Sequence, residues 1–194
     1  MLNNELNLKN FAFDGNESKR VRYTTKFANE KLSGALIVAE VGVQAGINAK
    51  SILLHSEIKR LYLIDPYGAT NSPYENHEEY FIRMFNNIEE FADKVMLIRQ
   101  PSLFAAFLFN DEYFDWVYID AMHDTINAGN DIKAWFHKVR FGGVVSGHDI
   151  GDPRVRKAVD EFVVEYNKEK SDAQKLELII KIDSDSDDWM FIKK

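Results

Sequence analysis

The sequence predicts an α/β protein built on a doubly wound, mostly parallel sheet. Short apolar runs rich in β-branched and aromatic residues alternate with longer stretches of helical periodicity along most of the chain. Parallel strands need a crossover connection, which is usually a helix. Two further β-patterned runs close the sequence with only a polar turn between them, which indicates a hairpin and one antiparallel strand. We therefore expect about seven strands, with helices on both faces of the sheet.

Each element follows from a local pattern of apolar residues. The runs that predict strands are Leu36–Val41, Leu61–Ile64, Val95–Ile98, Trp116–Ile119, Gly143–Ser146, Leu176–Ile182 and Trp189–Ile192. The stretches that predict helices are Glu17–Lys31, Ala45–Ser56, Tyr74–Phe91, Leu103–Leu108, Ile126–Val139 and Val155–Lys168. Asp152-Pro153 is a favourable start for the last helix, because Asp caps and Pro fits a first helical turn. Trp135 and Phe136 fall at helical spacing with other apolar residues and are expected in the core.

Length and composition are those of a globular protein. With 194 residues, of which 45% are hydrophobic and 28% charged, the chain can bury a core without disulfides or a structural metal. It has no cysteine, which excludes disulfides and cysteine-ligated zinc. We expect a single domain over residues 1–194, with residues 1–19 as an N-terminal extension.

Charge and hydropathy exclude several classes of partner. The formal net charge of −7, from 24 Lys+Arg against 31 Asp+Glu, argues against nucleic acid, because its binders depend on clustered cations. The longest apolar runs, Ala35–Val41 and Phe141–Ser146, are far shorter than the roughly 20 residues of a membrane span. Met1–Phe13 is rich in Asn and lacks the basic start and apolar run of a secretory signal. We expect no membrane partner and a cytoplasmic protein.

The segment Ala39–Asn48 is the first that predicts a ligand. A strand runs into Gly42 and Gly46, and a helix follows. Gly42 would permit a tight turn and a close approach of the backbone to the ligand, while the free N–H groups of the helix start would face it. A turn of this kind also occurs for purely structural reasons, so both interpretations stand. The pattern is neither Gly-x-Gly-x-x-Gly nor a phosphate loop, which disfavours a dinucleotide or a nucleoside triphosphate.

Asp65 closes the second predicted strand, about 20 residues after the glycine turn, where an acid can accept both hydroxyls of a ribose. The alternative interpretation is a turn cap, because Asp before Pro is common in turns. Together with the glycine turn, Asp65 favours a ligand that contains a nucleoside.

Four titratable side chains follow the fourth and fifth predicted strands. Asp120 and His123 come just after the fourth, and His148 and Asp149 come just after the fifth. The carboxyl ends of parallel strands meet at one edge of the sheet, so we expect these groups to converge beside the glycine turn. A lone histidine is more often a surface or capping residue, but four such groups at one edge favour a catalytic site.

With these segments in place, the chain resembles the class I S-adenosylmethionine-dependent methyltransferases, in particular a group of small O-methyltransferases. The resemblance spans roughly residues 20–194. It rests on five segments in this order: Glu40-Val-Gly-x-x-x-Gly46, Ile64-Asp65-Pro66, Asp115-Trp-Val-Tyr-Ile-Asp120-x-x-His123, Gly142-Gly143 and Gly147-His148-Asp149. It implies a Rossmann-like methyltransferase sheet, and the terminal hairpin agrees, because that family inserts an antiparallel last strand. It also implies an enzyme whose cofactor is S-adenosyl-L-methionine.

The resemblance also implies the cofactor contacts. The glycine loop would line the methionine end, Asp65 would hold the ribose, and Ser102 would be the polar contact of the adenine. The acid that usually follows the third strand in the family is missing here. The residues expected to contact the cofactor are Glu40, Gly42, Val43, Gln44, Gly46, Asn48, Asp65, Pro66, Ser102 and Asp120.

Catalysis has two interpretations at this point. Relatives that use a divalent cation place its ligands where this chain has Asp120, His148 and Asp149. Oxygen ligands suit Mg²⁺, whereas His148 shifts the preference toward Mn²⁺, Fe²⁺ or Zn²⁺. Without a metal, His123 or His148 would be the general base, because an unperturbed imidazole with a pKa of about 6.5 can take a hydroxyl proton. The expected catalytic residues are Asp120, His123 and His148.

The expected activity is methylation of an oxygen on a small-molecule or sugar-like acceptor. Two alternatives remain. A nicotinamide-dependent oxidoreductase would share Asp65 and the glycine turn but needs a triple-glycine fingerprint that the chain lacks. A catalytically silent cofactor-binding or scaffold protein would keep the fold and pair with another chain, and a homodimer is the assembly to consider. Convergence of Asp120, His123 and Asp149 beside a pocket would argue against the scaffold.

Two further segments have two interpretations each. Tyr67–Tyr74 is either a lid over the substrate or a surface loop. Arg20–Tyr23 either closes over the cofactor, as N-terminal segments do in similar enzymes, or caps the sheet.

Overall fold

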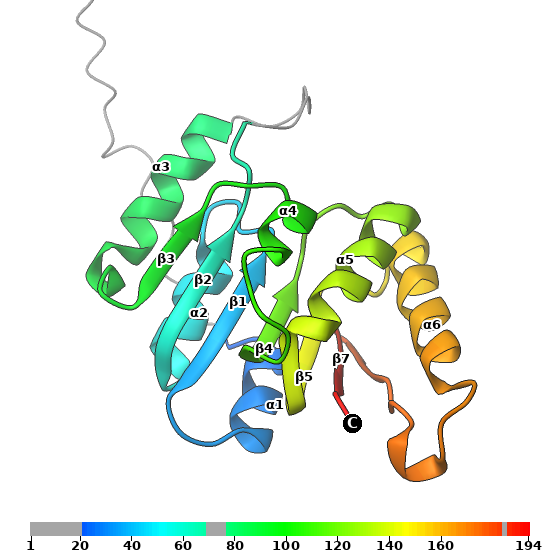
Figure 1. The fold of residues 1–194 in the computed structure, drawn as a ribbon. Coiled ribbons are helices and arrows are strands. Elements are labelled where there is room, and N and C mark those ends of the chain that lie inside the picture. Colours follow the sequence, from blue (N-terminus) through cyan, green and yellow to red (C-terminus); the bar gives the residue numbers. More distant parts are fainter. Residues whose placement is uncertain (1–20, 69–76, 184–185) are drawn as a thin grey trace, which may run out of the picture.

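A seven-stranded sheet runs through the molecule with helices on both faces (Figure 1). The computed structural model describes residues 21–68, 77–183 and 186–194. The strand order is β3-β2-β1-β4-β5-β7-β6. Strands β1 to β5 are parallel, and β7 lies antiparallel between β5 and β6. The predicted doubly wound sheet with an antiparallel C-terminal hairpin is therefore confirmed.

The strands and helices lie where they were predicted, although β2 and β5 begin three and four residues before their predicted starts and β6 begins three residues after its own. The strands are β1 (Leu36–Val41), β2 (Ile58–Ile64), β3 (Val95–Ile98), β4 (Phe114–Ile119), β5 (Val139–Gly147), β6 (Ile179–Ile182) and β7 (Asp187–Ile192). The helices are α1 (Tyr23–Lys31), α2 (Ile47–His55), α3 (His77–Ile88), α4 (Ser102–Ala106), α5 (Thr125–Lys138) and α6 (Pro153–Asn167), with short 3₁₀ turns at Glu89–Phe91 and Asp172–Gln174. The predicted starts at Glu17 and Tyr74, the extension 1–19, and most of the Tyr67–Tyr74 loop lie outside the described residues.

Caps explain where the two long helices begin. The Asp124 carboxylate accepts the Ile126 and Asn127 N–H groups at the start of α5. Asp152 accepts the Arg154 N–H at the start of α6, and Pro153 occupies its first turn, as predicted. The far end of α5 differs from its prediction, because Val139 is the first residue of β5 rather than the last of the helix.

The core has two layers, one on each side of the sheet. Helices α4, α5 and α6 pack on one face, and α1, α2 and α3 pack on the other. Trp135 and Phe136 of α5 are 0% and 4% exposed, which confirms their predicted place in the core. None of the helices in the described ranges has the length and apolar character needed to cross a bilayer.

The chain order reverses at the centre of the sheet, where β1 lies between β2 and β4. In open α/β sheets, ligands bind outside the carboxyl ends of the strands at this reversal. The loops after β1, β2, β4 and β5 meet at that edge, and they carry Asp65, Asp120, His123 and Asp149.

Candidate active site

Asp65, at the end of β2, organises the glycine loop after β1. Its Oδ2 accepts the backbone N–H groups of Val43 and Gln44, each at 3.0 Å, and its Oδ1 accepts the Tyr67 N–H at 2.9 Å. An ionised carboxylate offers about four lone-pair positions, so these bonds leave about one for a ligand. Asp65 is thus a turn cap, one of its two predicted interpretations, and Pro66 lies inside the turn.

The glycines of this loop are required by the packing of the protein itself. Gly42 has a φ of +84°, and a Cβ there would lie 2.0 Å from the backbone oxygen of Asp120. Gly46 has a φ of +72°, and its Cβ would lie 2.9 Å from Cγ of Met84 on α3. The packing alone thus requires a glycine at position 42, and the close approach of its backbone to a ligand stays a prediction. Gly42 lets the end of β1 pass against the end of β4.

Glu40 brings an unpartnered carboxylate oxygen to this loop. The side chain is buried, and its Oε1 accepts from Nδ2 of Asn48 at 3.3 Å. Glu40 Oε2 and Asn48 Oδ1 have no hydrogen-bond partner among the described residues. Burial raises the pKa of Glu40 to about 8. Buried acceptors without donors are costly, so this pair is suited to a ligand that brings N–H groups.

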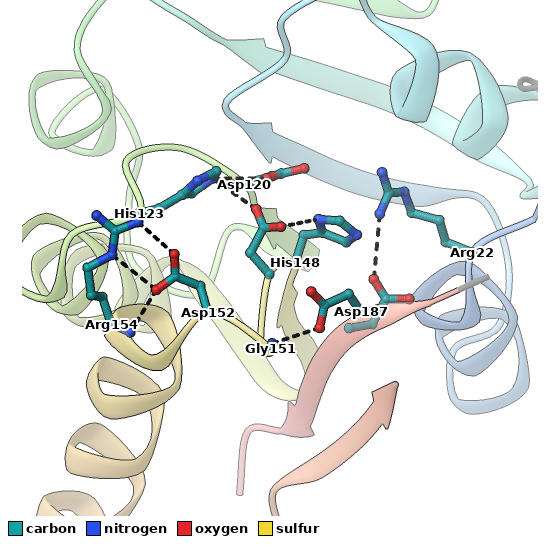
Figure 2. Close-up of polar contacts among 10 residues, drawn as sticks. Arg22, Asp120, His123, His148, Gly151, Asp152, Arg154 and Asp187 are labelled. Carbon is teal, nitrogen blue, oxygen red and sulfur yellow. Dashed lines mark hydrogen bonds and ion pairs between the residues drawn. The ribbon is translucent and has the colours of Figure 1, made fainter. Parts of the chain in front are cut away.

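Asp120, His123 and Asp149 form the densest cluster of titratable groups at the edge (Figure 2). One ligand atom from each lies within 4.8 Å of the others. The His123 Nε2 is 2.9 Å from Asp149 Oδ2 and 3.6 Å from Asp120 Oδ1. The structure thus brings together the groups expected after β4 and β5.

His148, which was expected as a metal ligand, lies outside this group of three, although it contacts Asp149. Its Nδ1 lies 3.1 Å from Asp149 Oδ1, on the side of the carboxylate that faces Arg22 (Figure 2). Asp149 has a φ of +55°, a left-handed conformation that is uncommon outside glycine and that recurs at functional sites. The chain turns at this residue, so one Asp149 oxygen faces each histidine. His123 replaces His148 in the set that can hold a metal.

The carboxylates change the acid–base state of both histidines. Hydrogen bonds to Asp120 and Asp149 raise the pKa of His123 to about 10. Burial lowers the pKa of His148, but the hydrogen bond to Asp149 together with the charges of Asp120 and Asp149 outweighs this effect, so the pKa is raised above its usual value. The two histidines hold the pKa of Asp149 far below its usual range. His123 is therefore cationic at neutral pH, which corrects the expectation of an unperturbed imidazole ready to accept a proton.

Ser102, the expected adenine contact, is engaged within the fold. It is the first residue of α4, and its hydroxyl donates to Asp131 Oδ1 at 2.5 Å and accepts from Trp135 Nε1 at 2.8 Å. Burial raises the pKa of Asp131 to about 6. Sequence reasoning missed Asp131, although a signal existed, because a carboxylate on the apolar stripe of α5 is out of place unless it has a partner.

This edge also holds Tyr67 and Arg22, which come from the two segments with open interpretations, and Asp188, which the sequence did not single out. The Tyr67 hydroxyl donates to the Gln44 carbonyl at 2.6 Å and so fastens the glycine loop. Arg22 lies 3.7 Å from Asp188, a carboxylate with no exposed surface. No local pattern marks either contact, because both join segments that are distant in sequence.

A small pocket lies beside the cluster and is partly open to solvent. Its walls are mostly apolar, and its polar groups come from the ends of β4 and β5. The lining residues are Ile119, Asp120, Ala121, Met122, His123, Ala128, Ile132, His148, Val155 and Trp189. The site thus combines a small apolar pocket with charged groups beside it.

Solved structures with the same fold include proteins that are described as methyltransferases. A putative methyltransferase from Streptococcus mutans, solved with S-adenosylhomocysteine, is 17% identical, with a TM-score of 0.64 over 88% of this chain and 96% of that one. A putative O-methyltransferase from Klebsiella pneumoniae is 13% identical, with a TM-score of 0.63 over 94% and 82%. An rRNA methylase from Streptococcus thermophilus is 13% identical, with a TM-score of 0.60 over 88% and 93%.

These identities establish a shared fold. No curated protein matches the chain. A family model described as a methyltransferase domain matches residues 39–150, more than half of the sequence. That range begins at the glycine loop and ends just after the Asp120, His123 and Asp149 cluster. This chain therefore belongs to the methyltransferase-domain family.

Proposed function

We propose that this methyltransferase uses S-adenosylmethionine to methylate an oxygen of a small-molecule or sugar-like acceptor, with help from a divalent cation. The observation that carries the proposal is the Asp120, His123 and Asp149 cluster, which lies at the same sheet edge as the Glu40 loop. The glycine loop suits the cofactor, and the Asp120, His123 and Asp149 cluster suits the reacting hydroxyl.

The residues of the glycine loop fit the cofactor. Glu40 Oε2 and Asn48 Oδ1 are buried acceptors without donors, and an ammonium group at the methionine end would satisfy them. Asp65 retains lone-pair capacity for a ribose hydroxyl. When bound, S-adenosylmethionine supplies a methyl group on a sulfonium, which an acceptor oxygen takes by in-line displacement.

The cluster fits a divalent cation. Two carboxylates and one imidazole are ligands that suit Mn²⁺, Fe²⁺ or Zn²⁺ better than the all-oxygen set that Mg²⁺ prefers. A cation held by Asp120, His123 and Asp149 would lower the pKa of an acceptor hydroxyl and fix its position.

Proton transfer in the absence of a cation falls to a carboxylate. His123 already holds its proton at neutral pH, so it can stabilise negative charge on the acceptor oxygen but cannot remove the proton. Asp120 lies beside it and is partly exposed, so its carboxylate is placed to accept a hydrogen bond from the acceptor hydroxyl. Asp149 holds both histidines in place through one oxygen each.

The pocket and the charge favour a small acceptor over RNA. The pocket beside the cluster is lined mostly by apolar side chains, with polar groups at its rim. The fold is shared with an rRNA methylase, so RNA is the competing acceptor. A net charge of −7 and a carboxylate-rich edge oppose binding to a phosphate backbone.

Calorimetric titration of S-adenosylmethionine and S-adenosylhomocysteine into the purified protein tests the proposal, with and without Mg²⁺ or Mn²⁺. We expect micromolar binding that is lost in Asp65→Ala, and a gain with Mn²⁺ that is lost in Asp149→Asn. Asp160→Asn, a partly exposed carboxylate on α6, is the matched control. Circular dichroism checks that each variant folds. Absence of binding with and without metal would overturn the proposal.

Assays of methyl transfer to phenols, diols, sugars and total RNA identify the acceptor class. Transfer to RNA alone would contradict the small-molecule proposal while leaving the cofactor assignment intact.

A further inference from the structure

Buried polar atoms without partners gather around Arg22, at the start of α1. Glu40 Oε2 and the Tyr118 hydroxyl lack a hydrogen bond within the described ranges. The Arg22 guanidinium lies 3.7 Å from Asp188 and 5.8 Å from the centre of the Tyr118 ring, and Glu40 of β1 pairs in register with Tyr118 of β4. Native proteins leave few buried polar atoms unsatisfied, so such a group indicates a missing water or ligand.

The Arg22 guanidinium has N–H groups without an acceptor among the described residues. It lies 3.7 Å from Asp188 Oδ1 and 5.8 Å from the centre of the Tyr118 ring, and its side chain is 27% exposed. Within the described part of the chain, no hydrogen bond from its five N–H groups accompanies these contacts. Figure 2 shows the side chain rising from α1 toward the edge that holds His148. Its free N–H groups suit a planar anion such as a carboxylate.

Arg22 and Glu40 together match the two charges of a free amino acid. An α-ammonium and an α-carboxylate sit on one carbon, so the site needs an anionic acceptor and a cationic donor a few ångströms apart. Glu40 pairs in register with Tyr118 on the neighbouring strand, and the Arg22 guanidinium lies over the Tyr118 ring, so Arg22 and Glu40 face the same part of the sheet. Glu40 lies near the end of β1, directly before the glycine loop, so the carboxylate bound by Arg22 fits the cofactor better than it fits an acceptor.

We propose that Arg22 binds the α-carboxylate at the amino-acid end of the cofactor, opposite Glu40, and that Asp188 is a positioning residue that holds the guanidinium there. The inference rests on the proposed use of S-adenosylmethionine. Of the Arg20–Tyr23 segment, Arg20 lies outside the described residues, and the inference assigns Arg22 to the cofactor rather than to a purely structural cap.

The test compares two ligands that differ only at the amino-acid end. S-adenosylhomocysteine carries that end, whereas 5′-methylthioadenosine has the same nucleoside and thioether but no ammonium or carboxylate. Arg22→Met is expected to weaken S-adenosylhomocysteine about ten- to hundredfold, the usual worth of hydrogen bonds to a charged group. It should leave the affinity for 5′-methylthioadenosine unchanged. Lys26→Met removes an exposed cation from the same helix and should change neither affinity.

Arg22→Lys keeps the charge and loses the planar fork, so its affinity for S-adenosylhomocysteine should fall between those of the wild type and Arg22→Met. If Arg22→Met fails to fold, Arg22→Lys alone tests whether Arg22 contributes to the binding of S-adenosylhomocysteine. Unchanged 5′-methylthioadenosine binding shows that the site is intact in each variant.

A double-mutant cycle tests the role of Asp188. Asp188→Asn should weaken S-adenosylhomocysteine several-fold in the wild-type background and have no effect in the Arg22→Met background, because its action passes through Arg22. Equal effects in both backgrounds would show that Asp188 acts on the fold alone.

The outcomes separate the inference from the proposed function. If the wild type binds neither ligand, the use of S-adenosylmethionine is wrong. If the wild type binds both and Arg22→Met weakens both equally or neither, Arg22 does not bind the α-carboxylate. An Arg22→Met variant with unchanged S-adenosylhomocysteine affinity but a raised KM for a carboxylate-bearing acceptor would move Arg22 to the acceptor site.

Discussion

The Nε2 of His123 lies 2.9 Å from Oδ2 of Asp149, so the loop after β4 is tied to the end of β5 by a charged hydrogen bond. The left-handed backbone at Asp149 directs this oxygen toward His123 while the other oxygen faces His148. One carboxylate therefore sets the position and the charge of two imidazoles.

The first prediction concerns the pH dependence of this contact. The pKa of His123 rises from 6.5 to about 10 on folding, so its stabilising effect is complete below pH 6.5 and is lost as the pH rises through 10. His123→Gln should lower the free energy of unfolding by about 1 kcal/mol at pH 6.5, allowing for solvent screening of this half-exposed group, and by little at pH 10. Urea unfolding at both pH values measures the difference.

The Asp149→Asn background provides the control for His123→Gln. With the partner charge removed, the effect of His123→Gln should be nearly the same at both pH values. An equal loss at pH 6.5 and pH 10 in the wild-type background would show that His123 is not held as an imidazolium.

A second prediction follows from the buried carboxyl of Glu40, whose pKa of about 8 keeps it protonated at neutral pH. Binding of an ammonium group favours the ionised carboxylate, so S-adenosylhomocysteine should release a proton, and its affinity should rise from pH 6 to pH 8 by up to roughly tenfold per pH unit. Calorimetry in phosphate and in Tris, which differ in ionisation enthalpy, measures the released proton.

Glu40→Gln should weaken binding and remove this proton release, whereas Glu57→Gln, at an exposed position, should leave both unchanged. Identical binding enthalpies in the two buffers for the wild type would contradict the assignment.

A third prediction separates backbone strain from steric conflict at glycine. Gly42 and Gly34 have similar φ values of +84° and +78°, but a Cβ on Gly42 would meet the Asp120 backbone oxygen, whereas nothing lies within 4 Å of a Cβ on Gly34. Gly34→Ala should cost about 1–2 kcal/mol for the left-handed conformation alone. Gly42→Ala should cost about 3 kcal/mol or more, because β1 and β4 must separate. Urea unfolding compares the two, and equal costs would refute the close contact.

The fourth prediction concerns the buried carboxyl of Asp131. Its pKa rises from 3.8 to about 6, so folding penalises the ionised form, and this penalty grows as the pH rises through that range. Asp131→Asn keeps an acceptor for the Ser102 hydroxyl and removes the penalty. Relative to the wild type, the variant should gain about 1–3 kcal/mol of stability between pH 4 and pH 7. Thermal melts at the two pH values test this, and a constant difference would mean that Asp131 does not ionise in the fold.

Much of the fold was predictable because the signals are local. Strands β1 and β3 have the bounds that their apolar runs predict, since a buried parallel strand must be apolar along its length. The terminal hairpin was equally visible, because two β-patterned runs with a short polar turn have no room for a crossover. The sheet edge that holds Asp120, His123 and Asp149 follows directly from these strand ends.

The sequence by itself thus determined the fold class, the family resemblance and the edge at which the polar residues meet. Tertiary structure alone decided which of them touch. The turn at Asp149 brings His123 into the cluster with Asp120. The close contact between the ends of β1 and β4 requires Gly42. The packing of α4 on α5 brings Ser102 to Asp131. The pairing of Arg22 with Asp188 joins the two ends of the described chain. Periodicity reports which face of an element is buried, whereas contacts between distant segments depend on backbone dihedrals and packing that no local pattern encodes.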